Sequence, residues 1–543
     1  MTTVRFLAEL ERLGVTFRPE GDRLRCSAPA GVLSPAVRAE LALRKAEILS
    51  HLRAVPRIVP VARDRDLPLS YAQQRLWVLH RLDPESPFYN CPISLRIRGP
   101  LDLPALEASL REVVRRHETL RTRFVEGEDG PVQILSPDAG FQLALADLIA
   151  LPADLREDAL RQAVRQETRR PFDLSRDLLL RALVVNLADG EGAAILTLHH
   201  IVCDGWSMGL LLREVGQLYG DLAARRPSRL PELPIQCADF AVWQRAWLAG
   251  ERLQEQLGYW VERLAGAPPL LKLPTDRPRP VAQRFRGGSK SRLLPASFAE
   301  SIRVLGRCEE ASLFMTLLAA FKALLHAYTG LCDLCIGSPV AGRNRAEVEG
   351  LIGFFANMLV LRTDMSGDPS FRELLSRVRA TSLTAFSHQD VPFDFLVETL
   401  RPDRDSSYGP LVQVAFDLQE VSSLSPSFPG LTLEPIGSDS GTSQFDLVLN
   451  AEDGPEGLLL CFEYDSDLFD GSTLVWMIED LDFVLQQVLR EPDVRLGALA
   501  TALSARGEER RRDSARNLEH ARLAKFRSIR RREPAYQAAE GGL

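Results

Sequence analysis

Two adjacent histidines, His199 and His200, are followed after three intervening residues by Asp204 and Gly205, and this group carries side chains suited to proton transfer. The apolar run at 193–198 predicts a strand leading into the histidines, and apolar residues at helical spacing follow Gly205. Neighbouring residues in a strand point to opposite faces, so both histidines cannot address one substrate. We therefore expect one histidine to serve the chemistry and the other to serve the structure.

Asp204 and Gly205 are expected to begin the helix that follows the strand. Aspartate is a favoured N-cap residue, and glycine permits a tight backbone turn. Backbone N–H groups at the start of a helix can stabilise a developing oxyanion. The Gly205 N–H is therefore a candidate donor in an acyl-transfer reaction.

The same stretch permits a second chemistry, because residues 205–209 (GWSMG) fit the G-x-S-x-G nucleophile elbow on a strand–turn–helix joint. In a serine hydrolase Ser207 would be the nucleophile, with His326 or His388 as its base. That interpretation leaves the histidine pair without a role and explains none of the motifs described below. We keep it as the weaker alternative.

The composition excludes several other classes of protein. The chain has 543 residues, 45% of them hydrophobic and 26% charged, which is typical of a globular protein with three or four folding units. The net charge of −7 argues against a nucleic-acid surface. No apolar run reaches the ~18 residues needed to span a membrane, and the N-terminal residues lack a secretory signal. These features predict a cytoplasmic protein.

The eight cysteines are scattered through the chain, which predicts reduced thiols. Cys332 and Cys335 form the only C-x-x-C pair. A zinc site of this type needs a second pair at similar spacing, so we expect no metal.

A series of motifs between residues 68 and 500 resembles, in type and order, those of the condensation domains of nonribosomal peptide synthetases, whose signature is H-H-x-x-x-D-G. Besides the histidine motif, the segments that carry the resemblance are 70–77 (SYAQQRLW), 116–124 (RHETLRTRF), 239–244 (DFAVWQ), 340–343 (VAGR), 352–358 (IGFFANM), 388–394 (HQDVPFD) and 404–411 (RDSSYGPL). Ala356, Met358, Asp394 and Gly409 depart from the family pattern.

The resemblance implies an α/β fold of two chloramphenicol-acetyltransferase-like lobes in a V arrangement with a central tunnel. The expected N-lobe spans 68–245 and the expected C-lobe 246–503. His200 would orient the acceptor or take its proton midway along the tunnel, and His199 would be structural.

The resemblance also implies roles for other residues. Arg343 would pair with Asp204 and hold the histidine loop in shape, and Arg116 and Arg121 would form ion pairs within the fold. The candidates for lining the tunnel or contacting the substrate are Gln73, Trp77, Trp206, Ser207 and Asn357.

The two ends of the chain differ from its middle. Residues 1–53 predict a helix, a hairpin around 20–22 and a further helix, and they resemble the β-hairpin docking domains of synthetase subunits. Such an α-β-β-α unit takes up a partner segment as an added strand, and Arg18, Arg23 and Arg25 would suit an acidic peptide. Residues 54–67 are expected to be a linker, and 504–543 a basic, mobile tail.

The predicted reaction is transfer of an acyl chain from the phosphopantetheine thioester of a carrier protein to an amine or hydroxyl acceptor. No bound cofactor is expected. The partners would be an upstream subunit, the donor carrier and either an acceptor carrier or a free small molecule. The intact histidine pair argues against the heterocyclising subtype, and an epimerising domain remains an alternative. The layout is also similar to free-standing, chain-releasing members such as the one in enacyloxin assembly.

Overall fold

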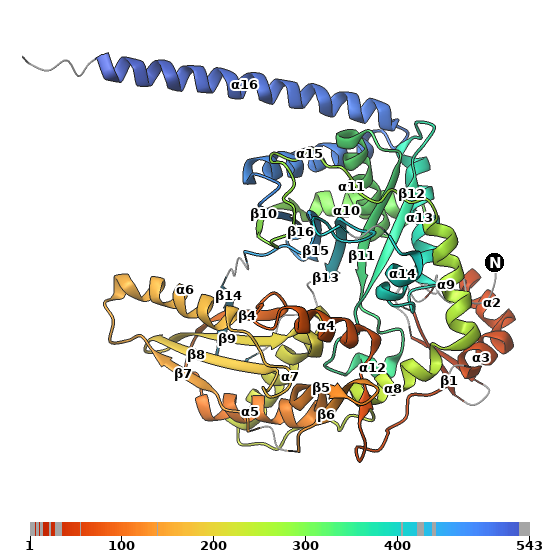
Figure 1. Cartoon of the computed structure of the whole chain (residues 1–543), viewed down its shortest axis with the longest axis vertical. Helices are drawn as coiled ribbons and strands as arrows, with labels where there is room; N and C mark the ends of the chain where they lie inside the picture. Colours follow the sequence, from red (N-terminus) through yellow and green to blue (C-terminus); the bar gives the residue numbers. More distant parts are fainter. Residues whose placement is uncertain are drawn as a thin grey trace, which may run out of the picture.

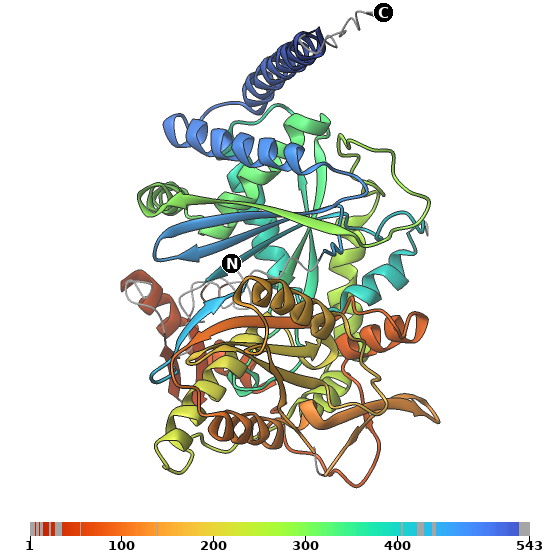
Figure 2. The same ribbon diagram turned by 90° about the vertical axis from the view of Figure 1, so that its left-hand side faces the viewer.

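Two α/β lobes stacked along the long axis make up most of the molecule (Figures 1 and 2). A small N-terminal unit lies at the side of the lobe junction, and a long helix extends away from the second lobe (Figure 1). The computed structural model describes residues 6, 10, 15–20, 23–27, 35–54, 56–137, 140–402, 405–420, 428–436 and 441–530.

The first lobe, the N-lobe, is built on two sheets. Its strands are β3 (Leu67–Pro68), β4 (Asn90–Arg98), β5 (Thr122–Gly127), β6 (Gly130–Leu135), β7 (Ala144–Asp147), β8 (Leu180–Ala188), β9 (Glu191–His199) and β14 (Thr432–Pro435). The main sheet has the order β14-β4-β9-β8-β7, and a smaller sheet has the order β3-β6-β5. Strand β9 is therefore central, and it ends at the histidine pair.

Helices cover both faces of the main N-lobe sheet. They are α4 (Tyr71–Leu82), α5 (Leu103–Arg116), α6 (Ala153–Arg169), α7 (Gly205–Ala223) and α8 (Cys237–Trp247). Alternate residues of β9 supply the two cores: Leu196 and Leu198 pack with α5 and α7, whereas Ala193 and Ile195 pack with α6. Because both faces of β9 are buried, its register is fixed up to the histidines.

The second lobe, the C-lobe, has one six-stranded sheet in the order β10-β16-β15-β13-β11-β12. Its strands are β10 (Gly287–Pro295), β11 (Asp333–Val340), β12 (Asn357–Asp364), β13 (Val414–Glu420), β15 (Leu447–Gly454) and β16 (Gly457–Asp465). Its helices are α9 (Gly250–Leu264), α10 (Ala296–Cys308), α11 (Leu313–Thr329), α12 (Ala346–Glu349), α13 (Phe371–Phe386), α14 (Phe393–Leu400), α15 (Gly471–Arg490) and α16 (Leu496–Arg530).

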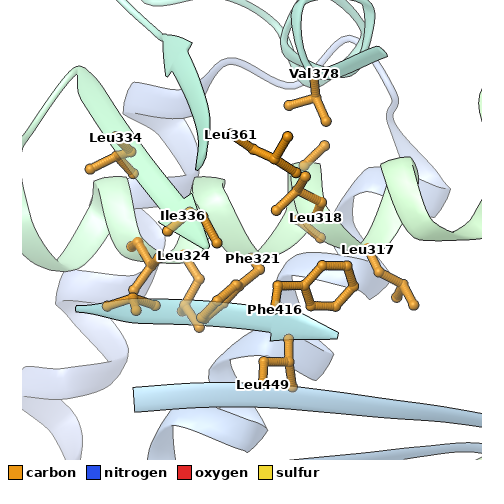
Figure 3. Close-up of a cluster of buried hydrophobic side chains, with 14 of the residues drawn as sticks. Leu317, Leu318, Phe321, Leu324, Leu334, Ile336, Leu361, Val378, Phe416 and Leu449 are labelled. Atoms are coloured by element: carbon orange, nitrogen blue, oxygen red, sulfur yellow. The ribbon is translucent and has the colours of Figure 1, made fainter. Parts of the chain in front are cut away.

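The core of the C-lobe lies between helix α11 and the sheet (Figure 3). Phe321 of α11 packs against Phe416 of β13, with ring centroids 6.3 Å apart. Ile336 of β11 and Leu449 of β15 complete this contact from the sheet. Helix α11 is apolar around most of its circumference because helices cover it as well as the sheet.

The two lobes exchange segments, so they are not consecutive blocks of sequence. Strand β14 lies in the expected C-lobe range, yet it pairs with β4 and extends the N-lobe sheet (Figure 2). Ile352, from the same range, is buried in the N-lobe core. The expected division at 245/246 falls within the last turn of α8, just before the crossing to α9, and it does not include these two returns of the chain.

The N-terminal unit contains the expected hairpin, β1 (Thr16–Glu20) and β2 (Arg23–Ser27), in antiparallel register. The expected second helix is divided at Arg44 into α2 (Pro35–Leu43) and α3 (Lys45–Ala54). Leu41 and Ile48 from these helices pack with Phe6, Leu10 and Val15 in a small separate core. Most of the expected first helix lies outside the described residues.

The expected linker and tail are more firmly packed than the sequence suggests. Ile58 is buried against the lobe junction, and Arg63 forms ion pairs with Glu118 and Asp239. Helix α16 begins before the expected tail, and Arg506 and Arg510 within it both pair with Asp480 of α15. The C-lobe therefore continues beyond 503, and the tail is anchored at its start.

Among the described helices, none is by itself long and apolar enough to cross a membrane; α10 and α11 meet that criterion only as a pair, which is bent by 98°.

Candidate active site

The histidine pair lies where β9 ends and the chain turns toward helix α7. His199 is the last residue of the strand, and His200 opens a short 3₁₀ turn, His200–Val202. The backbone N–H of His200 donates to the Tyr89 carbonyl at 2.8 Å, which joins the turn to the segment before β4. The change from strand to turn separates the two imidazole rings.

His199 is enclosed by other rings and serves the structure. Its side chain is 3% exposed, and its Nδ1 accepts a hydrogen bond from the Ile201 N–H at 3.1 Å. His80 and Phe172 meet its ring edge-on. Burial lowers the pKa of His199 to about 3, so the ring is neutral at physiological pH.

His200 is held in one orientation and in one tautomer. Its Nδ1 lies 2.7 Å from the Cys203 carbonyl oxygen, and because a carbonyl only accepts, Nδ1 carries the proton. The lone pair of the neutral ring is therefore on Nε2. Phe354, from the C-lobe range, meets the ring edge-on at 4.7 Å between centroids.

The pKa of His200 reflects opposing influences. Burial lowers the pKa, whereas the neighbouring Cys91 side chain, the Cys203 carbonyl and the Asp204 carboxylate each raise it, and the net direction is upward. A raised pKa makes the ring a stronger proton acceptor than an exposed histidine.

Asp204 caps helix α7, as the sequence predicts. Its Oδ1 accepts from the Ser207 N–H at 2.8 Å. Gly205, the first helical residue, is exposed, and a Cβ built on it would meet no atom within 4 Å. Its φ is not positive, so the backbone does not require glycine there. The missing side chain leaves open space beside the turn.

A buried ion pair connects this helix start to the C-lobe range. Arg343 Nη2 lies 3.1 Å from Asp204 Oδ1, and both side chains are less than 5% exposed. The other guanidinium nitrogen, Nη1, donates to the carbonyls of Val348 and Leu351 at 2.6 and 2.7 Å. The Phe355 N–H donates to Asp204 Oδ2 at 3.1 Å. This set of contacts, here called the Asp204–Arg343 clamp, fixes the histidine turn relative to the segment at 343–355.

Ser207 belongs to the same clamp and does not face a substrate. Its side chain is fully buried, and its hydroxyl lies 2.7 Å from Asp204 Oδ1 and 2.8 Å from the Gly353 carbonyl. It also accepts from Arg343 Nη2 at 2.9 Å. The expectation that Ser207 lines the tunnel is wrong, because its side chain is fully buried and its hydroxyl is bonded within the clamp.

The bases named for a serine hydrolase are engaged elsewhere. The Nδ1 atoms of His326 and His388 bond to the carbonyls of Leu331 and Thr384, and His388 also stacks on Tyr259 in the C-lobe. Neither histidine is among the hydrogen-bond partners that the structure records for Ser207. The geometry therefore does not support a nucleophile elbow.

Three other expected substrate contacts are structural. Gln73 is fully buried in a capping box with Ser70 at the start of α4, and Trp77 is buried in the N-lobe core. The amide of Asn357 donates to the Gln389 and Val391 carbonyls at 2.9 and 2.7 Å, and its oxygen accepts from the Phe393 N–H. Gln73 and Asn357 therefore bond to backbone groups, as buried polar side chains usually do, and Trp77 fills the core.

Trp206 differs from these three because it is 47% exposed. Its indole N–H donates to the Glu349 carbonyl at 2.9 Å, which orients the ring beside the clamp. It remains a predicted substrate contact.

The two arginines expected in structural ion pairs behave differently from each other. Arg116 is buried and pairs with Glu214 at 3.1 Å. Arg121 donates to the carbonyls of Ser136 and Arg115. Sequence reasoning missed His117, which contacts Glu214 at 2.8 Å and accepts from the Ile352 N–H, and so joins the two sequence halves a second time.

The site and the fold together describe a two-lobed α/β protein that holds one histidine, His200, in a fixed orientation where segments of the two lobes meet. Residues 63–509 match the condensation domain family, and residues 4–54 match the TubC N-terminal docking domain. The chain belongs to the condensation domain family and carries a docking domain of that type at its N-terminal end.

Relatives and solved structures agree with this assignment. The chain is 45% identical over 452 residues to a linear gramicidin synthase of Brevibacillus parabrevis, covering 83% of this chain and 6% of that protein. It is 41% identical over 459 residues to chondramide synthase cmdD of Chondromyces crocatus, covering 84% and 12% respectively. The chain thus spans only a small part of these relatives. The X-domain in its complex with OxyB from teicoplanin biosynthesis superimposes with a TM-score of 0.74 at 30% identity, covering 82% of this chain and 98% of that one.

We predict that Arg343→Gln destabilises the folded chain by about 3–5 kcal/mol, because it leaves the buried Asp204 carboxylate without its cation. Urea unfolding followed by circular dichroism measures this loss. Arg81→Gln is the matched control, since Arg81 and Glu126 form an exposed pair that contributes about 0–1 kcal/mol. Equal losses in the two variants would contradict the importance of the clamp.

Proposed function

We propose that this chain transfers an acyl group from the phosphopantetheine thioester of a carrier protein to an amine or hydroxyl acceptor. The observation that carries the proposal is the tautomer of His200: its Nδ1–H is committed to the Cys203 carbonyl, so Nε2 is available to accept a proton. Open space beside Gly205 gives reacting groups room at this point.

The proposed chemistry proceeds without a covalent acyl-enzyme. The acceptor nitrogen or oxygen attacks the thioester carbonyl, and its proton passes to Nε2 of His200. The Gly205 N–H at the start of α7 donates to the tetrahedral oxyanion. Collapse breaks the carbon–sulfur bond, and the proton held by His200 passes to the departing thiolate. The protein supplies no electrons, and the products are an amide or ester and a free phosphopantetheine thiol.

Both amide and ester formation are compatible with this site, but they require His200 to remove the proton at different stages of the reaction. A neutral amine is already nucleophilic, so the imidazole need only orient it and remove the proton after attack. A hydroxyl has a far higher pKa and needs the base during attack. A passage between the lobes that brings the two substrates to His200 from opposite sides stays part of this proposal.

Carrier proteins and a docking partner complete the proposed system. No resident cofactor is required, because the carrier's phosphopantetheine arm holds the donor. In the docking domain, Leu24 and Cys26 of β2 pack into its core, whereas Arg23 and Arg25 on the same strand are exposed. We infer that an acidic segment of a partner subunit adds to this hairpin as a strand. The side chain of Arg18, the third arginine proposed for docking, lies outside the described residues.

Replacing the proposed base tests the assignment directly. His200→Ala is expected to lower acyl transfer about 10²–10⁴-fold, the usual contribution of a positioned base, with the urea midpoint close to wild type. Product formation from a donor-loaded carrier is followed by mass spectrometry. Ser207→Ala should mainly lower the unfolding midpoint, because it removes a member of the clamp. Retained activity in His200→Ala together with complete loss in folded Ser207→Ala would instead support the serine hydrolase.

A second prediction concerns the space beside Gly205. Gly205→Val is expected to fold normally, since its φ is not positive and a Cβ there meets no atom, yet to lower kcat/KM by filling the space that the substrates need. Gly507→Val is the matched control, because Gly507 is also helical with nothing within 4 Å of an added Cβ. A Gly205→Val enzyme with wild-type kcat/KM would contradict this use of the space.

A third prediction separates docking from chemistry. Reversing charge with Arg23→Glu and Arg25→Glu should raise the KM for a donor carrier that bears the partner segment. Turnover of a free pantetheine thioester should stay unchanged. Arg38→Glu with Lys45→Glu changes the net charge of the same unit equally, on its helices, and should leave both rates unchanged. Equal losses with both donors would count against docking through the hairpin.

A further inference from the structure

Two cysteines from distant parts of the chain lie beside His200. Cys91 is the second residue of β4, and Cys203 follows the 3₁₀ turn that begins at His200. One ligand atom from each of Cys91, His200 and Cys203 lies within 4.8 Å of the other two. Both cysteines are free thiols. None of the steps proposed for acyl transfer uses either of them.

This set of side chains is one that a thiophilic metal ion prefers. Two thiolates and one imidazole are the protein ligands of a Cys₂His zinc site, in which the fourth position is left for water or another ligand. Zinc–sulfur bonds of about 2.3 Å and zinc–nitrogen bonds of about 2.0–2.1 Å set ligand atoms about 3.5–3.8 Å apart in a tetrahedron. The three ligand atoms, which all lie within 4.8 Å of one another, complete that geometry by moving closer together.

The scaffold around the cluster favours such a site. Cys91 lies opposite Leu198 in the ladder between β4 and β9, and the His200 N–H is bonded to the Tyr89 carbonyl. These contacts fix the two cysteine-bearing segments relative to each other. Cys203 is fully buried, whereas Cys91 and His200 are only partly covered. The partial exposure of Cys91 and His200 allows a small ion to reach the cluster.

We propose that Cys91, Cys203 and His200 bind a thiophilic divalent cation such as Zn²⁺, and that the bound ion switches off acyl transfer. Binding converts the two thiols into thiolates and releases two protons to solvent, with no change of oxidation state. The inhibitory consequence rests on the role proposed above for His200, whereas binding of the ion does not.

Loss of the base follows whichever ring nitrogen binds the ion. An ion on Nε2 occupies the lone pair that would accept the proton. An ion on Nδ1 displaces the proton from that atom, and the neutral ring then carries its proton on Nε2 and has no lone pair to offer. In both arrangements His200 is no longer a general base. Acyl transfer should then fall about 10²-fold or more, the contribution of such a base.

Cobalt substitution tests the site without reference to activity. The full chain, reduced with a phosphine and treated with a chelator, is titrated with Co²⁺ alone. One equivalent should produce thiolate-to-cobalt charge-transfer absorption in the near ultraviolet, and Zn²⁺ should remove it. Cys91→Ser and Cys203→Ser should each abolish the absorption. The control, Cys308→Ser with Cys332→Ser, removes two exposed thiols and should retain it.

The activity arm compares turnover with and without Zn²⁺ for each variant. Wild type and the control should lose activity when Zn²⁺ is added. In Cys91→Ser, the turnover rate with Zn²⁺ should be close to the rate without it. Cobalt absorption that persists in Cys91→Ser, or its complete absence in wild type, would overturn the site. If cobalt absorption appears but Zn²⁺ leaves turnover unchanged, only the proposed inhibition is overturned. If the chain binds cobalt but its metal-free form transfers no acyl group, the result counts against the proposed function instead.

Discussion

A buried ion pair between Asp204 and Arg343 is the constraint on which the site depends. A carboxylate this deeply buried is tolerated only when a cation and hydrogen-bond donors surround it, and here Arg343, Ser207 and the Phe355 N–H supply them. The pair joins a helix start in the N-lobe to a segment that arrives from the C-lobe sheet. Because His200 lies four residues before Asp204, the position of its ring depends on how the two lobes are joined.

Much of the fold could be predicted because its signals are local. The apolar run before the histidines and the hairpin around 20–22 depend on periodicity and turn chemistry, and the structure confirms both. The exchange of segments between lobes could not be predicted in this way. Strand β14 is only four residues long and pairs with a strand more than three hundred residues earlier, so nothing near it in sequence indicates the partner.

Among the site residues, too, local features could be predicted from the sequence and long-range contacts could not. Asp204 as a helix cap follows from a local rule. Strand alternation predicted that the two histidines would differ, but in the structure the 3₁₀ turn that begins at His200 separates them. Gln73, Trp77, Ser207 and Asn357 were expected to face the substrate, yet they bind backbone groups or fill the core. A motif marks a position that the fold constrains, but it does not indicate the direction of the side chain. Polar residues in a motif are as often required by buried backbone groups as by a ligand.

The immediate surroundings of His200 show what local patterns leave out. The Cys203 carbonyl, three residues ahead, sets its tautomer, and Phe354 meets its ring edge-on. One of the two neighbouring thiols belongs to Cys91, which is more than one hundred residues away in the sequence. The carbonyl contact favours a neutral base with a free Nε2 lone pair, and the same free imidazole beside two thiols is a ligand set for a soft metal ion. The arrangement that makes His200 a good proton acceptor therefore also makes it vulnerable to such an ion. Acyl transfer at this site requires Cys91 and Cys203 to remain metal-free while the base is in use.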